Sequence, residues 1–355
     1  MTIGPRTFLL VLVVVACSSG NTTNPAPVSC VGGTDATRIP INDLGQSCYL
    51  EFRGGLYLEG SNVLSGAHLE AGRAAAAQIR PLDVNGQPSA SGKYVLLSIG
   101  MSNTTQEFCN DGAQARTCLS PGFMAQAAAD PAVNHATLVL VNGAAGGKAA
   151  PSWFGTAGDT EYDRIRTTWL TPLGLSEQQV QIAWVKVANP GPTTRLPNAN
   201  ADAYVLEGQL GQIARALKMR YPNLRQIFLS SRIYAGYATT TLNPEPYAYE
   251  NAFSVKWAIE SQIAQMAGGT AGARTGDLNY DTGMAPWLAW GPYLWAAGTS
   301  PRSDGLTWVT TDFAPDGTHP ATSGRQKVGA QLLTFLKTSP VTSCWFLAGQ
   351  ICPGP

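Results

Sequence analysis

The sequence has few charged side chains and few histidines. Only 13% of its 355 residues are charged, the 23 basic and 23 acidic residues balance, and three histidines are present. Without a basic cluster, neither nucleic acid nor anionic lipid is expected as a partner. The histidines are scattered and no C-x-x-C pair occurs, so zinc-type ligand spacing is missing and no metal or cofactor is predicted.

Two other signals are missing. No G-x-S-x-G occurs, which excludes the α/β-hydrolase elbow in its usual form. No apolar run is long enough to span a bilayer. The run from Phe8 to Ala16 follows a single positive charge at Arg6, which is typical of a secretory signal and predicts removal of residues 1–16.

The end of this run, Val14-Val15-Ala16-Cys17, resembles a bacterial lipoprotein cleavage box. Cys17 would then be the lipidated first residue, and residues 17–29 would form a flexible tether. The alternative is ordinary signal cleavage nearby. The predicted location is the bacterial cell envelope, lipid-anchored at the outer membrane or cell surface, and otherwise periplasmic or secreted.

Cysteine usage agrees with export. Seven cysteines are present, and six remain once Cys17 is set aside, an even number. Short loops are the favoured closures, although the sequence allows other connectivities. The predicted disulfides are Cys30–Cys48, Cys109–Cys118 and Cys344–Cys352.

Apolar strand-like runs alternate with amphipathic helical stretches over residues 93–340. This alternation predicts an α/β fold, a three-layer α/β/α sandwich whose central sheet is mostly parallel. Residues 30–92 alternate and turn on glycines, which predicts a small β-rich N-terminal extension, and residues 341–355 form a disulfide-closed tail. The predicted strands are residues 94–100, 136–143, 180–189 and 224–234.

Polar residues follow these strands, at the edge where ligands of parallel sheets lie. Ser102 follows the first strand, and its hydroxyl needs a base to become a nucleophile. His319 precedes the last helix, and Asp316 lies three residues before it, a spacing that lets the carboxylate reach the imidazole. Each also has a structural explanation: Ser102 as a turn or cap residue, and Asp316 as the first residue of an Asx turn.

Three segments together resemble the SGNH (GDSL-like) hydrolases, in the branch of the carbohydrate acetylesterases and sialate O-acetylesterase-like proteins. They are G-M-S-N (100–103), N-G-A-A-G-G-K-A-A-P-S-W (142–153) and D-G-T-H followed by a helix (316–332). The resemblance covers residues 93–337. It implies Ser102 as nucleophile, His319 as general base and then acid, and Asp316 as the residue that orients His319.

The same resemblance implies an oxyanion hole. Its donors would be the backbone N–H of the nucleophile and that of Gly146, with Gly143 and Gly147 as alternatives for the glycine. The family carries Asn or Gln after the third strand as a third donor. This chain departs from that pattern, and either Asn189 or Lys186 would act as the third donor.

Four residues are predicted to line the substrate cleft: Lys148, Trp153, Arg232 and Tyr234. A surface ion pair is the alternative for Arg232. The aromatic cluster at 287–295 is either a sugar-stacking platform or core. The segment D-L-N-Y-D-T-G (277–283) spaces its oxygens like a calcium loop, but its glycine falls one place late and the distal Glu is missing, so a turn is favoured.

The predicted function is a serine-dependent carboxylic ester hydrolase that acts through an acyl-enzyme and deacetylates a carbohydrate or another small acyl ester. A broad-range lipase or aryl esterase of the same fold is one alternative. A catalytically silent carbohydrate-binding lipoprotein is the other. The partner is a small-molecule or carbohydrate ester, and a monomer is expected.

Overall fold

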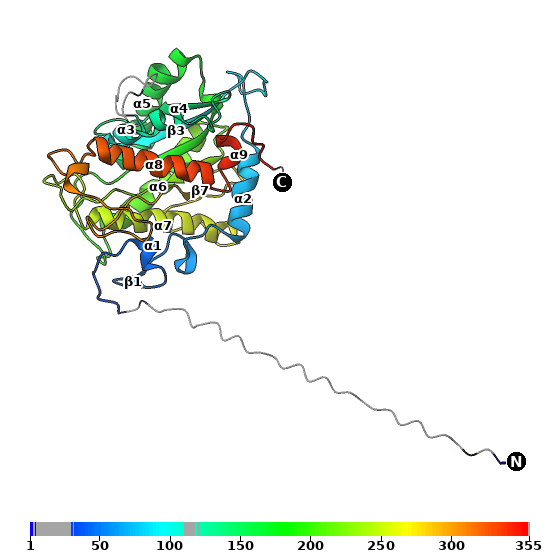
Figure 1. Cartoon of the computed structure of the whole chain (residues 1–355), viewed down its shortest axis with the longest axis horizontal. Coiled ribbons are helices and arrows are strands. Elements are labelled where there is room, and N and C mark those ends of the chain that lie inside the picture. The colour runs from blue at the N-terminus through cyan, green and yellow to red at the C-terminus, as the bar shows by residue number, and fades with distance from the viewer. Residues whose placement is uncertain (3, 5–29, 31, 110–117, 119–120, 354–355) are drawn as a thin grey trace.

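The computed structural model describes residues 1–2, 4, 30, 32–109, 118 and 121–353. Cys17, the tether 17–29 and most of the predicted signal peptide lie outside the described residues. The fold is α/β, as predicted: helices cover a five-stranded parallel sheet with the strand order β4-β3-β5-β6-β7 (Figure 1).

The sheet strands are β3 (Tyr94–Gly100), β4 (Leu138–Asn142), β5 (Val180–Lys186), β6 (Gln226–Leu229) and β7 (Trp287–Trp290). The helices are α1 (Ile41–Leu44), α2 (Gly66–Ala77), α3 (Ser102–Phe108), α4 (Phe123–Ala129), α5 (Gly155–Ile165), α6 (Asp202–Arg220), α7 (Tyr247–Met266), α8 (Thr322–Thr338) and α9 (Ser343–Phe346). A separate hairpin consists of β1 (Cys48–Tyr49) and β2 (Phe52–Arg53). Short helical turns are η1 (Leu58–Gly60), η2 (Ala150–Trp153), η3 (Arg166–Leu170), η4 (Thr171–Leu173), η5 (Glu177–Gln179) and η6 (Thr310–Asp312).

The sheet separates two hydrophobic cores because side chains alternate between its faces. In β3, Val95, Leu97 and Ile99 belong to one core, and Tyr94 and Leu96 belong to the other. Every residue of β3 is buried, as expected for a parallel strand covered on both sides.

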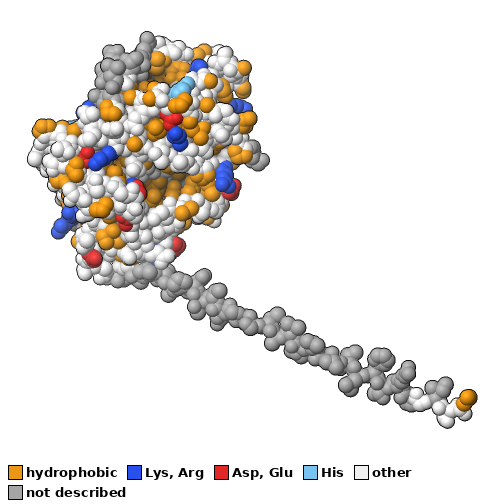
Figure 2. Space-filling model, viewed as in Figure 1, with side chains coloured by type: hydrophobic (Ala, Val, Ile, Leu, Met, Phe, Trp, Pro, Cys, Tyr) orange, Lys and Arg blue, Asp and Glu red, His pale blue; other side chains and the backbone are white. Residues whose placement is uncertain are grey.

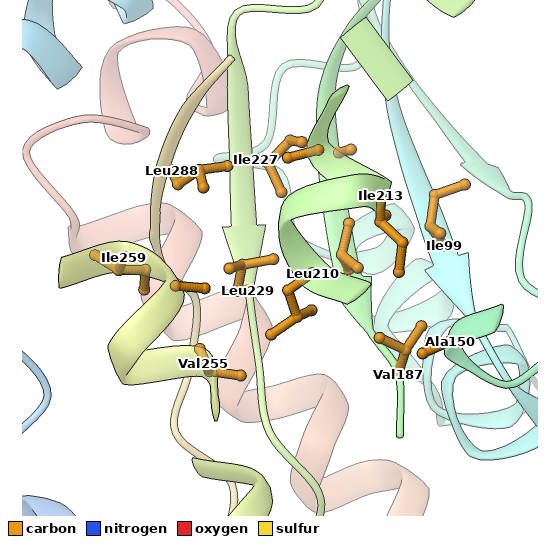
Figure 3. Packing of buried hydrophobic residues seen from close by; sticks show 14 of the residues in the cluster. Ile99, Ala150, Val187, Leu210, Ile213, Ile227, Leu229, Val255, Ile259 and Leu288 are labelled. Atoms are coloured by element: carbon orange, nitrogen blue, oxygen red, sulfur yellow. The ribbon is translucent and has the colours of Figure 1, made fainter. Parts of the chain in front are cut away.

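Helices α6 and α7 cover the first face. Figure 3 shows their apolar side chains meeting those of the strands: Leu210, Ile213, Val255 and Ile259 with Ile99, Ile227, Leu229 and Leu288. Residues from α2, α3, α4, α8 and α9 pack against the second face. The sheet therefore lies between two helical layers, and its carboxyl edge holds the segments that follow β3, β5 and β6.

Two sequence predictions need correction. The extension over residues 30–92 is not β-rich: its strands have two residues each, whereas α2 has twelve. Helix α2 packs on the sheet, where the Trp287 indole N–H donates to the His68 carbonyl oxygen at 2.9 Å. The fifth strand, β7, was not predicted. All four residues of its segment, 287–290, are buried. Of the two alternatives for the aromatic cluster, this segment therefore fits the core.

The three predicted disulfides are present, with Cα–Cα distances of 6.0 Å for Cys30–Cys48, 5.5 Å for Cys109–Cys118 and 4.6 Å for Cys344–Cys352. Disulfides are typical of proteins of the periplasm or the exterior of the cell. In the described part of the chain, no helix combines the length and the apolar character needed to cross a bilayer. On the face in Figure 2, Lys and Arg side chains are scattered among Asp and Glu and form no single-sign patch.

Candidate active site

Ser102 lies where a strand turns sharply into a helix. Strand β3 ends at Gly100, and Ser102 is the first residue of α3. A Cβ at Gly100 would overlap the carbonyl oxygen of Lys186 in the neighbouring strand, so only glycine fits there. The Thr104 hydroxyl donates to that same carbonyl at 2.6 Å and holds α3 against β5. The serine is therefore fixed at the carboxyl edge of the sheet.

The aspartate and the histidine share one tight turn before α8. The Asp316 Oδ1 atom accepts hydrogen bonds from the backbone N–H groups of Thr318 and His319, at 2.9 and 3.0 Å. Gly317, with φ of 63°, takes the left-handed conformation, and a Cβ there would overlap the carbonyl oxygen of Tyr237. Asp316 is thus an Asx-turn residue and a partner of the histidine at once.

The structure brings the three side chains together. The Ser102 Oγ lies 2.8 Å from His319 Nε2, and His319 Nδ1 lies 2.5 Å from Asp316 Oδ2. An ionised carboxylate only accepts, so Nδ1 carries the proton and Nε2 is free to accept the Ser102 hydroxyl proton. Burial acts to raise the pKa of Asp316, but hydrogen bonds from the His319 backbone and ring and from Thr318 outweigh burial and lower this pKa.

Other segments also form hydrogen bonds to the turn of Asp316 and His319, through residues that the sequence analysis did not single out. The Asn103 side-chain amide donates to the Thr318 carbonyl at 2.9 Å. The hydroxyls of Thr240 and Thr318 lie 2.7 Å apart, and the Thr239 N–H donates to the Asp316 carbonyl at 3.0 Å. The only signal for Asn103 was its place beside Ser102 in the G-M-S-N segment.

A buried ion pair joins helix α3 to strand β5. Lys186 Nζ donates to both carboxylate oxygens of Glu107, at 2.7 and 2.6 Å, and both side chains are fully buried. Burial lowers the pKa of Lys186 to about 8, although Glu107 opposes the shift and the nearby Arg232 adds to it. The Arg232 side chain is 1% exposed, and its Nε and Nη2 atoms have no hydrogen-bond partner among the described residues.

The predicted oxyanion donors have different surroundings. Gly146 lies in the exposed turn after β4, and the neighbouring Ala145 N–H donates to the Gly100 carbonyl at 3.0 Å, which holds this turn beside the strand that leads to Ser102. A Cβ at Gly146 would meet no atom within 4 Å, so the fold itself does not require glycine there. Asn189 Nδ2 donates instead to the Asp202 carbonyl at 2.7 Å, and the Lys186 ammonium is paired with Glu107.

Two of the four predicted substrate-binding residues are buried, and their assignment is wrong. Trp153 is 0% exposed and donates its indole N–H to the Lys148 carbonyl at 3.0 Å, so no ligand reaches its ring. Arg232, at 1% exposed, neither lines an open cleft nor forms a surface ion pair. Lys148 forms an ion pair with Glu161 at 2.7 Å. Tyr234 is half-buried beside Tyr237, with ring centroids 5.2 Å apart, and stays a candidate.

The remaining candidates lie elsewhere. In the 277–283 segment, the Asp277 and Asn279 side chains accept hydrogen bonds from the backbone of their own turn, as an ordinary turn predicts. Across the described residues, no group of three or more His, Cys, Asp or Glu side chains could hold a metal ion. The cavity of about 330 Å³ that Trp290, Arg302 and Phe335 help to line contains none of the three side chains of the Ser102 site.

No family model matches the chain, and no curated protein does. Among solved structures, it is similar to a protein assigned as a GDSL-like lipase from Parabacteroides merdae, with 13% identity, coverage of 72% of this chain and 97% of that chain, and a TM-score of 0.37. An extracellular lipase from Streptomyces rimosus has 16% identity, coverage of 68% and 98%, and a TM-score of 0.32. A carbohydrate esterase family 2 enzyme from Corynascus thermopiles has 14% identity, coverage of 69% and 66%, and a TM-score of 0.35.

Proposed function

We propose that this protein is a serine-dependent carboxylic ester hydrolase with Ser102 as nucleophile, His319 as general base and then acid, and Asp316 as the residue that orients His319. The observation that supports this is the continuous hydrogen-bonded relay from Ser102 Oγ to Asp316 Oδ2, with distances of 2.8 and 2.5 Å. A nucleophile whose base is itself oriented by a third group is the arrangement that acyl transfer requires.

In the acylation step, Ser102 Oγ attacks the ester carbonyl carbon while His319 Nε2 takes the hydroxyl proton. Asp316 stabilises the imidazolium that forms. His319 then gives the proton to the leaving alkoxide oxygen, the C–O bond breaks, and the acyl group stays on Ser102. A water molecule repeats the sequence with His319 as base and releases the acid. The backbone N–H groups of Ser102 and Gly146 are the proposed donors to the oxyanion.

The proposed substrate is a small acyl ester, foremost an acetyl ester of a carbohydrate. This choice depends on the sequence resemblance of the three segments, because a fold alone does not specify a substrate. A lipase or aryl esterase with a broader acyl range would use the same three residues. A silent carbohydrate-binding protein would have no need of the hydrogen-bonded relay.

The test is hydrolysis of p-nitrophenyl acetate together with active-site labelling. We expect Ser102→Ala to abolish both the hydrolysis and labelling by a fluorophosphonate, while the melting temperature stays close to that of the wild type. Ser323→Ala, which changes an exposed hydroxyl bonded to the Thr311 carbonyl, is the matched control and should keep full activity. Full activity in Ser102→Ala would refute the assignment. A series of p-nitrophenyl esters with increasing acyl length should favour acetate, whereas a preference for long chains would favour the lipase.

We further propose that the protein is exported and anchored through a lipidated Cys17. Mass spectrometry of the N-terminal peptide from membrane fractions tests this. A diacylglyceryl group on Cys17 supports the anchor, and an unmodified N-terminus near this position supports ordinary signal cleavage.

A further inference from the structure

A small cavity lies between α6, α7 and the segment that follows β5. Its volume is about 10 Å³, enough for one water-sized occupant. Asn189, Asn243 and Asn251 line it together with the acidic residues Asp202 and Glu250. The three asparagines are 6%, 4% and 2% exposed, so each one is at least nine-tenths buried.

The hydrogen bonds of two of these asparagines fix the orientation of their amides. Asn189 Nδ2 donates to the Asp202 carbonyl at 2.7 Å, and Asn251 Nδ2 donates to the Val187 carbonyl at 3.3 Å. Turning either amide over would place two oxygens against each other, so the side-chain oxygens must point the other way. The Oδ1 atoms of Asn189, Asn243 and Asn251 are all buried, and none has a hydrogen-bond partner among the described residues.

The lining of this cavity offers acceptors and almost no donors. None of its residues is Lys, Arg or His. Two of them carry hydroxyls: Ser254 donates its own to the Ala203 carbonyl at 2.7 Å, and Tyr247 has the other. A water molecule has two protons to donate, so it can satisfy two of the three amide oxygens. A cation satisfies all three at once, and leaving a buried acceptor unpaired costs about 1–3 kcal/mol.

We propose that this cavity binds a hard, oxygen-liganded cation, Ca²⁺ or Na⁺, through the amide oxygens of Asn189, Asn243 and Asn251. The carboxylates of Asp202 and Glu250 supply negative charge beside it; they already accept hydrogen bonds, Asp202 Oδ2 from the Thr193 and Thr194 N–H groups and Glu250 from the Tyr49 hydroxyl and the Leu196 N–H. Carboxylate and amide carbonyl oxygens are the ligands that Ca²⁺ takes in proteins. The site differs from the 277–283 turn, whose side-chain oxygens already accept hydrogen bonds from their own backbone. The sequence did not predict it, because its ligands are asparagines that come from three separate segments.

The position of the site links it to the turn that carries Asp316 and His319. Asn189 belongs to the segment after β5, Asn251 to α7, and Asn243 to the segment that follows β6. This last segment also donates from the Thr239 N–H to the Asp316 carbonyl, and its Thr240 hydroxyl contacts Thr318. A cation that joins the three asparagines would therefore stabilise the fold and hold the segment that supports His319.

The test is a thermal melt of the full chain after treatment with EGTA and exchange into choline chloride, followed by titration with CaCl2 or NaCl at constant ionic strength. We expect a saturable rise in melting temperature with one of the two cations, and for Ca²⁺ a dissociation constant on the order of 10⁻⁴–10⁻³ M, as in extracellular calcium modules. The cation that produces the rise identifies the occupant. No rise with either cation overturns the proposal and leaves water as the occupant. Because the readout is stability, failure of the proposed esterase activity would not affect the result.

Variants assign the effect to the cavity. Asn243→Asp adds an anionic ligand and should tighten binding about tenfold, because affinity follows the charge of the ligands. Asn251→Leu should abolish the rise in melting temperature. Asp281→Ala, in the exposed 277–283 turn, is the matched control and should respond like the wild type. If Asn251→Leu does not fold, Asn243→Asp still decides. Unchanged affinity in Asn243→Asp, or loss of the response in Asp281→Ala, overturns the assignment.

Discussion

The side-chain amide of Asn103 donates a hydrogen bond of 2.9 Å to the backbone carbonyl oxygen of Thr318. Asn103 follows the candidate nucleophile, and Thr318 precedes the candidate base, so one buried bond joins two segments that are 215 positions apart in the chain. Both residues are 2% exposed. The relative position of Ser102 and His319 therefore depends on a contact outside the side chains of Ser102, Asp316 and His319.

Replacing Asn103 by leucine should impair catalysis more than binding. The substitution removes the donor to Thr318, and a misplacement of about 1 Å in an active site can lower the rate on the order of 100-fold. We expect kcat for p-nitrophenyl acetate to fall about 10- to 100-fold while KM changes little, and the unfolding free energy to fall by about 1–3 kcal/mol.

The rate of fluorophosphonate labelling should fall in parallel with kcat, which a purely structural role of Asn103 would not require. Asn200→Ala, in an exposed turn, is the control and should keep wild-type values. Wild-type kcat and labelling in a folded Asn103→Leu would show that the bond does not position the base.

Substitutions of Glu107 and Lys186 should have strongly coupled effects on the free energy of unfolding. Each single substitution, Glu107→Gln or Lys186→Met, leaves one fully buried partner without its counter-charge. Breaking a buried pair in this way costs about 3–5 kcal/mol, whereas replacing both partners costs far less. We expect the double variant to recover most of the loss, measured by urea unfolding as a double-mutant cycle. Additive losses in the double variant would contradict the coupling.

The meeting of Ser102, Asp316 and His319 was predictable from sequence because each has a strong local signal. Ser102 directly follows an apolar strand-like run, and Asp316 precedes His319 by three residues in a turn rich in glycine and proline. Parallel topology then requires strand ends to meet at one edge. Sequence does not give the burial of a side chain, and for that reason Trp153 and Arg232 were assigned to a cleft although both are core residues.

The two errors in the fold have a related cause. The segment of β7 has only four residues, and all of them are buried because both faces of the strand are covered. A run of this length has no period that distinguishes a strand from an aromatic cluster. Helix α2 has no strong apolar stripe, so a search for periodicity misses it although its alanines favour a helix. Its Gly72 packs closely against the Trp287 ring.

Reduction of the disulfides should lower the melting temperature. The three bridges close loops with sequence separations of 18, 9 and 8 residues. Loops of roughly this length contribute about 3 kcal/mol each through the entropy of the unfolded chain. We expect Cys30→Ala/Cys48→Ala to lose about this amount in urea unfolding, and non-reducing peptide mapping should recover the three pairs. A melting temperature unaffected by reductant would mean that the cysteines are not paired.

The free energy of unfolding should decline in mild acid because His68 is buried in its neutral form. Burial lowers the pKa of His68 from 6.5 to about 4, partly opposed by the hydrogen bond of its Nε2 to the Leu288 carbonyl. Between these two pKa values the unfolded chain binds a proton that the folded chain does not, so the contribution of His68 is complete above pH 6.5 and is lost as the pH falls toward 4. The full loss corresponds to about 3 kcal/mol, and about 2 kcal/mol of it should fall between roughly pH 7 and pH 5.

Substitution His68→Gln isolates this contribution, because glutamine offers an amide donor to Leu288 and does not titrate. We expect this variant to be less stable than the wild type near neutral pH but to lose about 2 kcal/mol less of its unfolding free energy between roughly pH 7 and pH 5, measured by urea unfolding. His135→Gln removes an exposed ring whose Nε2 lies 3.0 Å from the Asp130 carbonyl, and it should keep the pH dependence of the wild type. If His68→Gln and the wild type lost equal stability over this range, His68 would have to be charged in the folded protein, and the buried imidazole would need a proton acceptor for its Nδ1, which has no hydrogen-bond partner among the described residues.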